Sequence, residues 1–209
     1  MTEQILGWTR TERLGVADLL DELTPEEWAA DTLCAGWTVR DLAAHLTLST
    51  RTTLPMVIVG AIRARGSFDR MEDQLSRQRA ARFTPAELVA QIRETAGSPR
   101  RTPGAGPLDP LVDFLVHGQD VARPLGRVRP APVEPTLAAL EHVRDSAFYG
   151  ARKRLRGTRL VATDADWTGG TGPDELRGPA IDLLLLATGR PAGLAAVSGP
   201  GAEQVAARL

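Results

Sequence analysis

Hydrophobic residues in the first two thirds of the chain recur at the spacing of α-helices. One pattern covers residues 2–23. Another runs from residue 38 to about residue 64, where Pro55 predicts a kink because proline lacks a backbone donor. Residues 24–27 and 84–87 each read Thr-Pro-X-Glu, a capping box with proline at the first helical position, and each predicts the start of a helix.

Two more helices are predicted next, from Asp109 to about Pro124 and over residues 134–151. After Gly157, glycine becomes frequent and short apolar runs replace the helical spacing. The short elements expected there are strands at 159–163 and 194–197 and helices at 180–188 and 202–209. We therefore expect a mainly α fold, with a helical bundle over residues 1–152 and a small α+β domain over residues 153–209.

The composition is that of an ordinary globular protein, with 209 residues and 43% hydrophobic residues. A formal net charge of −1 provides no electrostatic basis for binding nucleic acid or an anionic membrane, so neither is expected as a partner. No apolar run approaches the roughly 20 residues that span a bilayer. The N-terminus lacks the pattern of a signal peptide, and Cys34 is the single cysteine, so we expect a cytoplasmic protein without an internal disulfide.

Two of the three histidines lie in segments that suggest a metal site. Asp113 and His117 are four residues apart and share one face of a predicted helix, and His45 lies on the apolar face of an earlier helix. Two imidazoles and a carboxylate with an open position are the ligand set of a catalytic divalent metal, zinc first. The alternative is a helical protein in which a hydrogen-bonded core histidine and a surface Asp–His pair are unrelated.

Other candidate residues favour simpler explanations. His142 falls opposite the apolar face of its predicted helix, which indicates a solvated side chain. Cys34 has no histidine near it in the sequence and is interpreted as a structural thiol rather than a nucleophile. Asp120 is a polar helix end, or an acceptor for the second nitrogen of a ligand imidazole.

Several segments, in order along the chain, resemble the mycothiol-dependent maleylpyruvate isomerase family of the DinB-like superfamily. The first is residues 34–46, which read CAGWTVRDLAAHL, and the second is residues 113–126, which contain His-Gly-Gln-Asp and Arg-Pro-Leu-Gly. The C-terminal part is also similar, at residues 162–164 with Trp167, at 178–180 and at 188–190.

The resemblance implies a DinB-like four-helix-type bundle with a metal between helices, followed by a sterol-carrier-like α+β domain. It implies that His45, Asp113 and His117 bind the metal, although Asp113 stands where the family usually has glutamate. The arginines in the region of the family's substrate-binding arginine are Arg77, Arg79 and Arg82.

The function implied is a zinc-type metalloenzyme that uses a low-molecular-weight thiol, mycothiol, for isomerisation or S-transfer. Its partners would be that thiol and a small electrophilic substrate such as maleylpyruvate. The alternative is a non-catalytic metal-binding, small-molecule-binding or stress-response protein with the same fold. The shorter carboxylate of Asp113 is the feature that favours this alternative.

Overall fold

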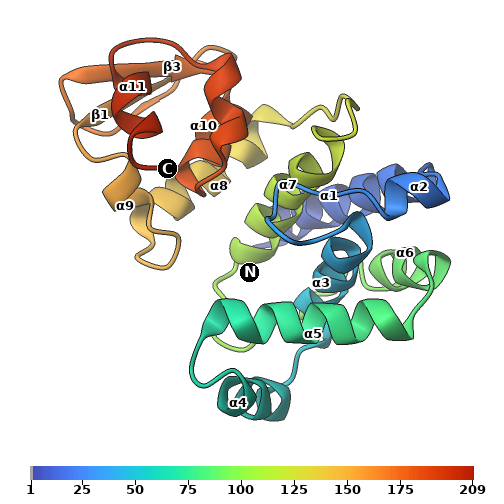
Figure 1. Cartoon of the computed structure of the whole chain (residues 1–209). Coiled ribbons are helices and arrows are strands. Elements are labelled where there is room, and N and C mark those ends of the chain that lie inside the picture. The colour runs from blue at the N-terminus through green and yellow to red at the C-terminus, as the bar shows by residue number, and fades with distance from the viewer. Residues whose placement is uncertain (1) are drawn as a thin grey trace. The chain divides into compact units, whose positions relative to one another are not determined.

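The computed structural model describes residues 2–209 and is mainly helical, with one three-stranded sheet (Figure 1). The chain divides into two compact units, one ending at Arg129 and the other comprising Pro130–Leu209. The expected fold class, mainly α with a small α+β part toward the C-terminus, is confirmed. No helix among residues 2–209 combines the length and the apolar character needed to cross a membrane.

The regular elements in the described part of the first unit are all helices. Its helices are α1 (Glu3–Asp21), α2 (Pro25–Trp28), α3 (Val39–Arg51), α4 (Leu54–Arg63), α5 (Phe68–Arg82), α6 (Pro85–Glu94) and α7 (Asp109–Ala122). Three of them begin with a reciprocal capping box, in which a threonine and an acidic residue three positions later satisfy each other's backbone N–H groups. These pairs are Thr24 and Glu27, Thr38 and Asp41, and Thr84 and Glu87.

The core of the first unit lies where α1, α3, α6 and α7 pack together. Buried side chains from these helices include Leu20, Leu42, Ile92 and Phe114. Arg13 is also buried, and it donates hydrogen bonds to the carbonyl groups of residues 95, 96 and 98 just beyond α6. Since those carbonyl groups have no partner within a helix, Arg13 joins α1 to the end of α6.

The helix expected from residue 38 to residue 64 is two helices. α3 ends before the extended backbone of Thr52, and α4 begins with Pro55 in its first turn, where proline costs no hydrogen bond. α5 lies outside the helices predicted from apolar spacing, because it is largely polar and lacks a clear apolar stripe. α5 nevertheless packs against both α3 and α4.

The second unit combines helices with the small sheet. Its elements are α8 (Val133–Asp145), α9 (Ala151–Arg154), β1 (Thr158–Ala162), β2 (Thr168–Gly169), β3 (Asp174–Gly178), α10 (Ala180–Ala187), the 3₁₀-helix η1 (Pro191–Ala196) and α11 (Gly201–Ala206). β1 is the central strand, antiparallel to β2 and parallel to β3, with Leu160 opposite Leu176. The apolar helix α10 is buried along most of its length and packs against α8 and η1.

Several details of the second unit differ from expectation, among them the short elements α9 and β2, which were not predicted. The helix predicted over residues 134–151 ends at Asp145, and Phe148, which lies within the predicted range, is exposed. Residues 194–197 are not a strand, since η1 covers most of them and only Ser198 bridges to Arg177. β3 was missed because its sequence, Asp-Glu-Leu-Arg-Gly, buries few side chains.

The boundary between the units lies earlier than the predicted domain boundary at residue 152. The difference concerns α8, which packs against α10 and belongs by its contacts to the second unit. Helical spacing identifies α8 as a helix but carries no information about which helices it packs against.

Candidate metal centre

The three predicted metal ligands come together between two packed helices of the first unit. His45 projects from α3, whereas Asp113 and His117 project from α7 one turn apart. The Nε2 atoms of His45 and His117 lie 3.6 Å and 3.3 Å from Oδ1 of Asp113. One donor atom from each residue lies within 4.8 Å of the other two.

These distances fit a divalent metal ion. Donor atoms about 2.1 Å from a tetrahedral metal lie about 3.4 Å from one another, close to the spacing between Asp113 and both histidines. The set is two imidazole nitrogens and one carboxylate oxygen, as in catalytic zinc sites that keep a position open for water or substrate. The short carboxylate of Asp113 therefore reaches both histidines.

The other nitrogen of each imidazole faces a second carboxylate. Nδ1 of His117 lies 2.8 Å from Oδ2 of Asp120, whose side chain is fully buried. Nδ1 of His45 lies 3.2 Å from Oε2 of Glu72 on α5. The hydrogen bond with Asp120 places the proton of His117 on Nδ1 and leaves Nε2 free to coordinate, which is the usual surrounding of metal-bound histidines. Glu72 faces Nδ1 of His45 as an ion-pair partner, in a geometry that does not form a hydrogen bond.

The charges of the cluster shift the pKa values of all three proposed ligands. Burial opposes protonation of His45, but Asp113 and Glu72 outweigh it and raise its pKa to about 9. His117 is also buried, yet Cys34, Asp113 and Asp120 raise its pKa well above the ordinary value. Burial disfavours the charged form of Asp113, but the two histidines outweigh it and hold its pKa well below the ordinary range. The site thus favours positive charge between its carboxylates, which a metal ion can supply in place of protons.

Trp37 forms one wall of the site. Its ring lies 5.2 Å from the ring of His45, centre to centre, and its indole N–H donates a 2.9 Å hydrogen bond to Asp73. Asp73 also accepts a 2.7 Å hydrogen bond from Arg77. Trp37, Asp73 and Arg77 therefore connect the segment before α3 with α5 beside the proposed ligands.

Cys34 lies closer to the site than the sequence analysis expected. Its sulfur lies 3.7 Å from Nδ1 of His117 and donates a 3.2 Å hydrogen bond to Oδ2 of Asp120. Cys34, His117 and Asp120 form a second possible set of metal donors. The sulfur, however, faces the imidazole nitrogen opposite the one that approaches Asp113.

The three candidate substrate-binding arginines occupy different surroundings. Arg77 is exposed, and besides Asp73 it donates a 2.6 Å hydrogen bond to the carbonyl oxygen of Gly36. Arg79 is half-buried and donates hydrogen bonds to Thr47 and Gln91. The guanidinium groups of Arg79 and Arg82 each lie over the ring of Phe83. Only Arg77 is connected through its contacts to a residue that touches His45.

His142 lies in the second unit, outside this cluster. Its side chain is half-buried rather than solvated, with its ring 6.1 Å from the ring of Tyr149.

Glu72 and Trp37 were not predicted to lie at the site, and neither was Cys34. For Trp37 and Cys34 a signal existed, since both lie in the segment 34–46 that carries the family resemblance.

Comparison with known proteins gives a consistent picture of the fold. The comparison with curated protein sequences gives no match. A crystal structure of the mycothiol-dependent maleylpyruvate isomerase is similar, with a TM-score of 0.61, 15% identity and 96% of each chain covered. A histidine-to-alanine mutant of the mycothiol-dependent maleylpyruvate isomerase has a TM-score of 0.58 at the same identity and coverage.

The family comparison covers most of the chain. Residues 9–156 match the family described as the mycothiol maleylpyruvate isomerase N-terminal domain. This range contains the whole cluster around His45, Asp113 and His117. The chain is therefore a member of the mycothiol maleylpyruvate isomerase N-terminal domain family.

Proposed function

We propose that the protein is a cytoplasmic, mycothiol-dependent metalloenzyme that acts on a small electrophilic substrate by isomerisation or S-transfer. The observation that carries the proposal is the pairing at each histidine. One nitrogen approaches the shared oxygen of Asp113, and the other faces a carboxylate of its own. A helical protein that buried two unrelated histidines would not need this arrangement, which places five costly polar side chains together.

In this proposal His45, Asp113 and His117 hold a zinc-type divalent ion. When bound, such an ion would supply the positive charge that keeps a thiol in its reactive thiolate form near neutral pH. Asp120 holds the proton at Nδ1 of His117 and so orients its Nε2 toward the ion, and Glu72 supplies a negative charge beside Nδ1 of His45. Asp113 offsets part of the charge of the ion.

The position of Cys34 supports a thiol supplied by a cofactor. The Cys34 sulfur lies on the Nδ1 side of His117, behind the ligand ring, and its hydrogen bond to Asp120 occupies it. A substrate that approached Nε2 would therefore not meet the Cys34 sulfur. Among the candidate arginines, Arg77 is the one we propose for substrate contact, since it is exposed and joined to the site through Asp73 and Trp37.

The alternative, a non-catalytic binding or stress-response protein of the same fold, rests on the aspartate at position 113. The reach of Asp113 to both histidines weakens this argument, because the donor set is complete with the shorter side chain. Metal content and turnover together distinguish the two functions.

The experiment compares wild type with His45→Ala, and uses His142→Ala as the matched control outside the site. Metal content is measured by mass spectrometry, and turnover of maleylpyruvate and a panel of electrophiles is measured with and without mycothiol. We expect His45→Ala to lose both metal and thiol-dependent turnover, because two remaining ligands bind a catalytic zinc poorly. Bound metal without turnover of any substrate would favour the non-catalytic alternative.

A further inference from the structure

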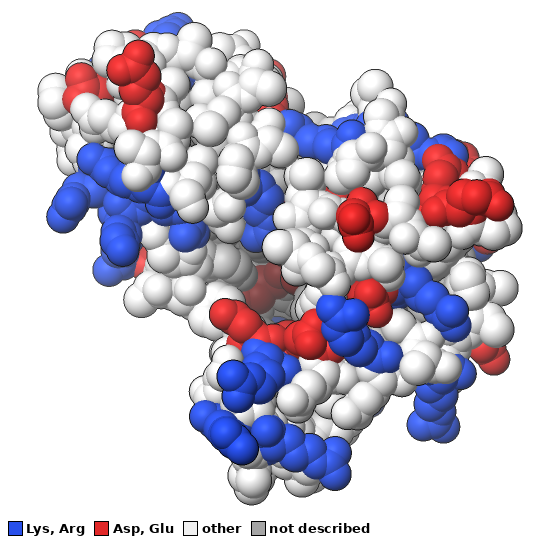
Figure 2. Space-filling model, viewed as in Figure 1, with Lys and Arg blue, Asp and Glu red and all other residues white. Residues whose placement is uncertain are grey.

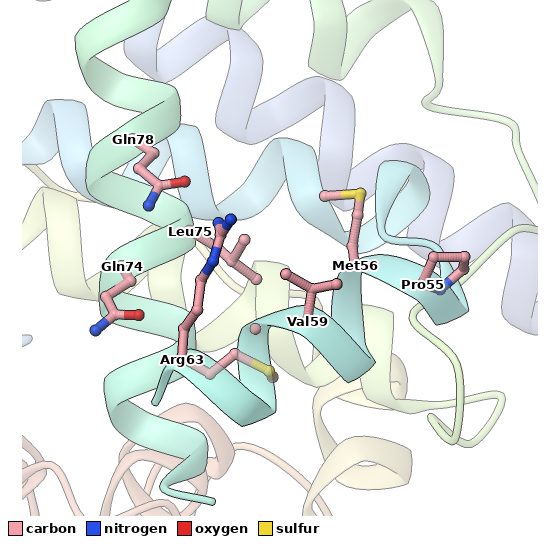
Figure 3. Close-up of a pocket in the computed structure, with 9 residues that line it drawn as sticks. Pro55, Met56, Val59, Arg63, Gln74, Leu75 and Gln78 are labelled. Atoms are coloured by element: carbon pink, nitrogen blue, oxygen red, sulfur yellow. The ribbon is translucent and has the colours of Figure 1, made fainter. Parts of the chain in front are cut away.

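A pocket of about 360 Å³ lies between α4 and α5, and its volume falls within the range of small-molecule sites. Its apolar lining includes Met56 and Val59 from α4 and Met71 and Leu75 from α5 (Figure 3). None of the proposed metal ligands lines it. α5 thus has two roles, since Glu72 faces His45 while neighbouring residues line the pocket.

The glycine in the middle of α4 allows the two helices to approach at the pocket. A Cβ atom at Gly60 would lie 2.8 Å from Cγ of Met71, which is closer than carbon atoms pack. The buried side chain of Met71 therefore fills the space above Gly60. Methionine is flexible and polarisable, so Met56 and Met71 provide a lining that adapts to a ligand.

The polar groups of the pocket carry one positive charge and no negative charge. Arg63 from α4 and Gln74 and Gln78 from α5 line it, and no acidic residue does. None of these three side chains makes an ion pair or hydrogen bond with another residue of the described chain. No aspartate or glutamate occurs anywhere in residues 42–68, whereas Arg63 and Arg65 are exposed there. Figure 2 shows basic side chains over the part of the molecule where α4 lies.

Exposed apolar side chains surround the pocket. The large hydrophobic residues of α4 and the first residue of α5 that stay exposed are Leu54, Ile58, Val59, Ile62 and Phe68. Contiguous exposed apolar residues on a globular protein indicate an interaction site. Since the pocket beside them offers an unpaired guanidinium and two amides, the matching ligand has an apolar body and a negative head group.

We propose that the pocket between α4 and α5 binds an amphipathic carboxylic acid, with its apolar body against Met56, Val59 and Leu75 and its carboxylate on Arg63. The guanidinium can bind both carboxylate oxygens, and the amides of Gln74 and Gln78 lie on the same face of α5 to complete the polar end. This site is separate from the metal centre and does not depend on the function proposed for that centre.

Binding of octanoate and of octanol to the full-length protein, measured by isothermal titration calorimetry, tests the proposal. We expect wild type to bind octanoate more tightly than octanol. Arg63→Gln should weaken octanoate binding at least about tenfold, as expected for loss of a charge-assisted hydrogen bond, and should leave octanol binding unchanged. Arg70→Gln, at an exposed arginine of α5 that does not line the pocket, should change neither.

A second pair of variants tests the apolar part. Val59→Trp should block the pocket and abolish binding of both ligands, whereas Ile62→Trp introduces the same side chain at an exposed position outside the lining and should not. Equal octanoate affinity in wild type and Arg63→Gln would overturn the proposal, and so would absence of octanoate binding at millimolar concentration. A concentration-dependent dimer that Val59→Trp abolishes would assign the surface to a second copy of the chain and overturn the proposal. Binding to anionic vesicles in place of octanoate would assign it to a membrane and overturn the proposal as well.

Discussion

The buried carboxylate of Asp120 lies 2.8 Å from Nδ1 of His117, on the side of the imidazole away from Asp113. This contact assigns the proton of the neutral imidazole to Nδ1 and leaves Nε2 as the free donor. Asp120 has no exposed side-chain surface, and the contacts with His117 and Cys34 compensate part of the cost of burying its charge. Asp120 thus determines the orientation of a proposed metal ligand without touching the metal.

We expect Asp120→Asn to lower metal affinity about 10- to 100-fold, the usual effect of losing a carboxylate behind a ligand histidine. The substitution keeps the shape of the side chain but removes its charge. Competition with a chromophoric chelator measures the affinity. Asp18→Asn, at an exposed position paired with Arg93, is the control and should leave the affinity unchanged. Equal affinities for wild type and Asp120→Asn would contradict this role.

Much of the fold and the site could be predicted from local sequence. The capping threonines at positions 24 and 84 begin helices as predicted, because the capping box involves residues only three apart. Asp113 and His117 were identified as neighbours for the same reason, since positions four apart share a helix face.

What the sequence could not predict depends on contacts between distant segments. Glu72 reaches His45 only because α5 packs on α3, and α5 itself is too polar to be identified by apolar periodicity. Cys34 was interpreted as a structural thiol away from any histidine, yet packing brings its sulfur to His117 and Asp120. Neither contact leaves a periodic pattern in the sequence.

We expect Cys34→Ser to retain thiol-dependent turnover. The serine hydroxyl can still donate a hydrogen bond to Asp120, and the side chain lies on the Nδ1 side of His117 rather than beside Nε2. Turnover of maleylpyruvate and other electrophiles, with and without mycothiol, is the measurement, and Cys34→Ala tests whether the hydrogen bond itself matters. Turnover that needs no added thiol and disappears in Cys34→Ser would assign the nucleophile to the protein.

The stability of the metal-free protein should fall between neutral and alkaline pH. The pKa of His45 in the folded protein is about 9, above its ordinary value of 6.5. The contribution of His45 to the free energy of unfolding is therefore fully present below pH 6.5 and is lost as pH rises through about 9. The depressed pKa of Asp113 acts in the opposite direction, because its contribution is present above the ordinary value of 3.8 and is lost as pH falls below it. Metal-free protein should therefore be most stable in mildly acidic solution.

Binding of metal should oppose the loss of stability that we expect for the metal-free protein from neutral to alkaline pH. Coordination needs neutral imidazoles, so metal competes with the protons on His45 and His117, and its stabilising effect should grow from pH 6.5 to 9. Thermal unfolding of both forms across this range tests the prediction. Addition of metal near pH 7 in weak buffer should also release protons. A metal-free protein that becomes more stable from pH 7 to pH 9 would show that these imidazoles are neutral when folded.

Asp113→Glu tests whether the site is built around the shorter carboxylate. Oδ1 of Asp113 already lies 3.3 Å and 3.6 Å from the two Nε2 atoms, close to the spacing of donors around a tetrahedral ion. An added methylene group must displace the carboxylate from this position, so we expect metal affinity to fall by about tenfold and thiol-dependent turnover to fall with it. Asp113→Asn, which keeps the length but removes the charge, should lose more affinity than Asp113→Glu. If glutamate instead raises affinity or turnover, the aspartate is what limits this chain, and a non-catalytic role for the native protein gains support.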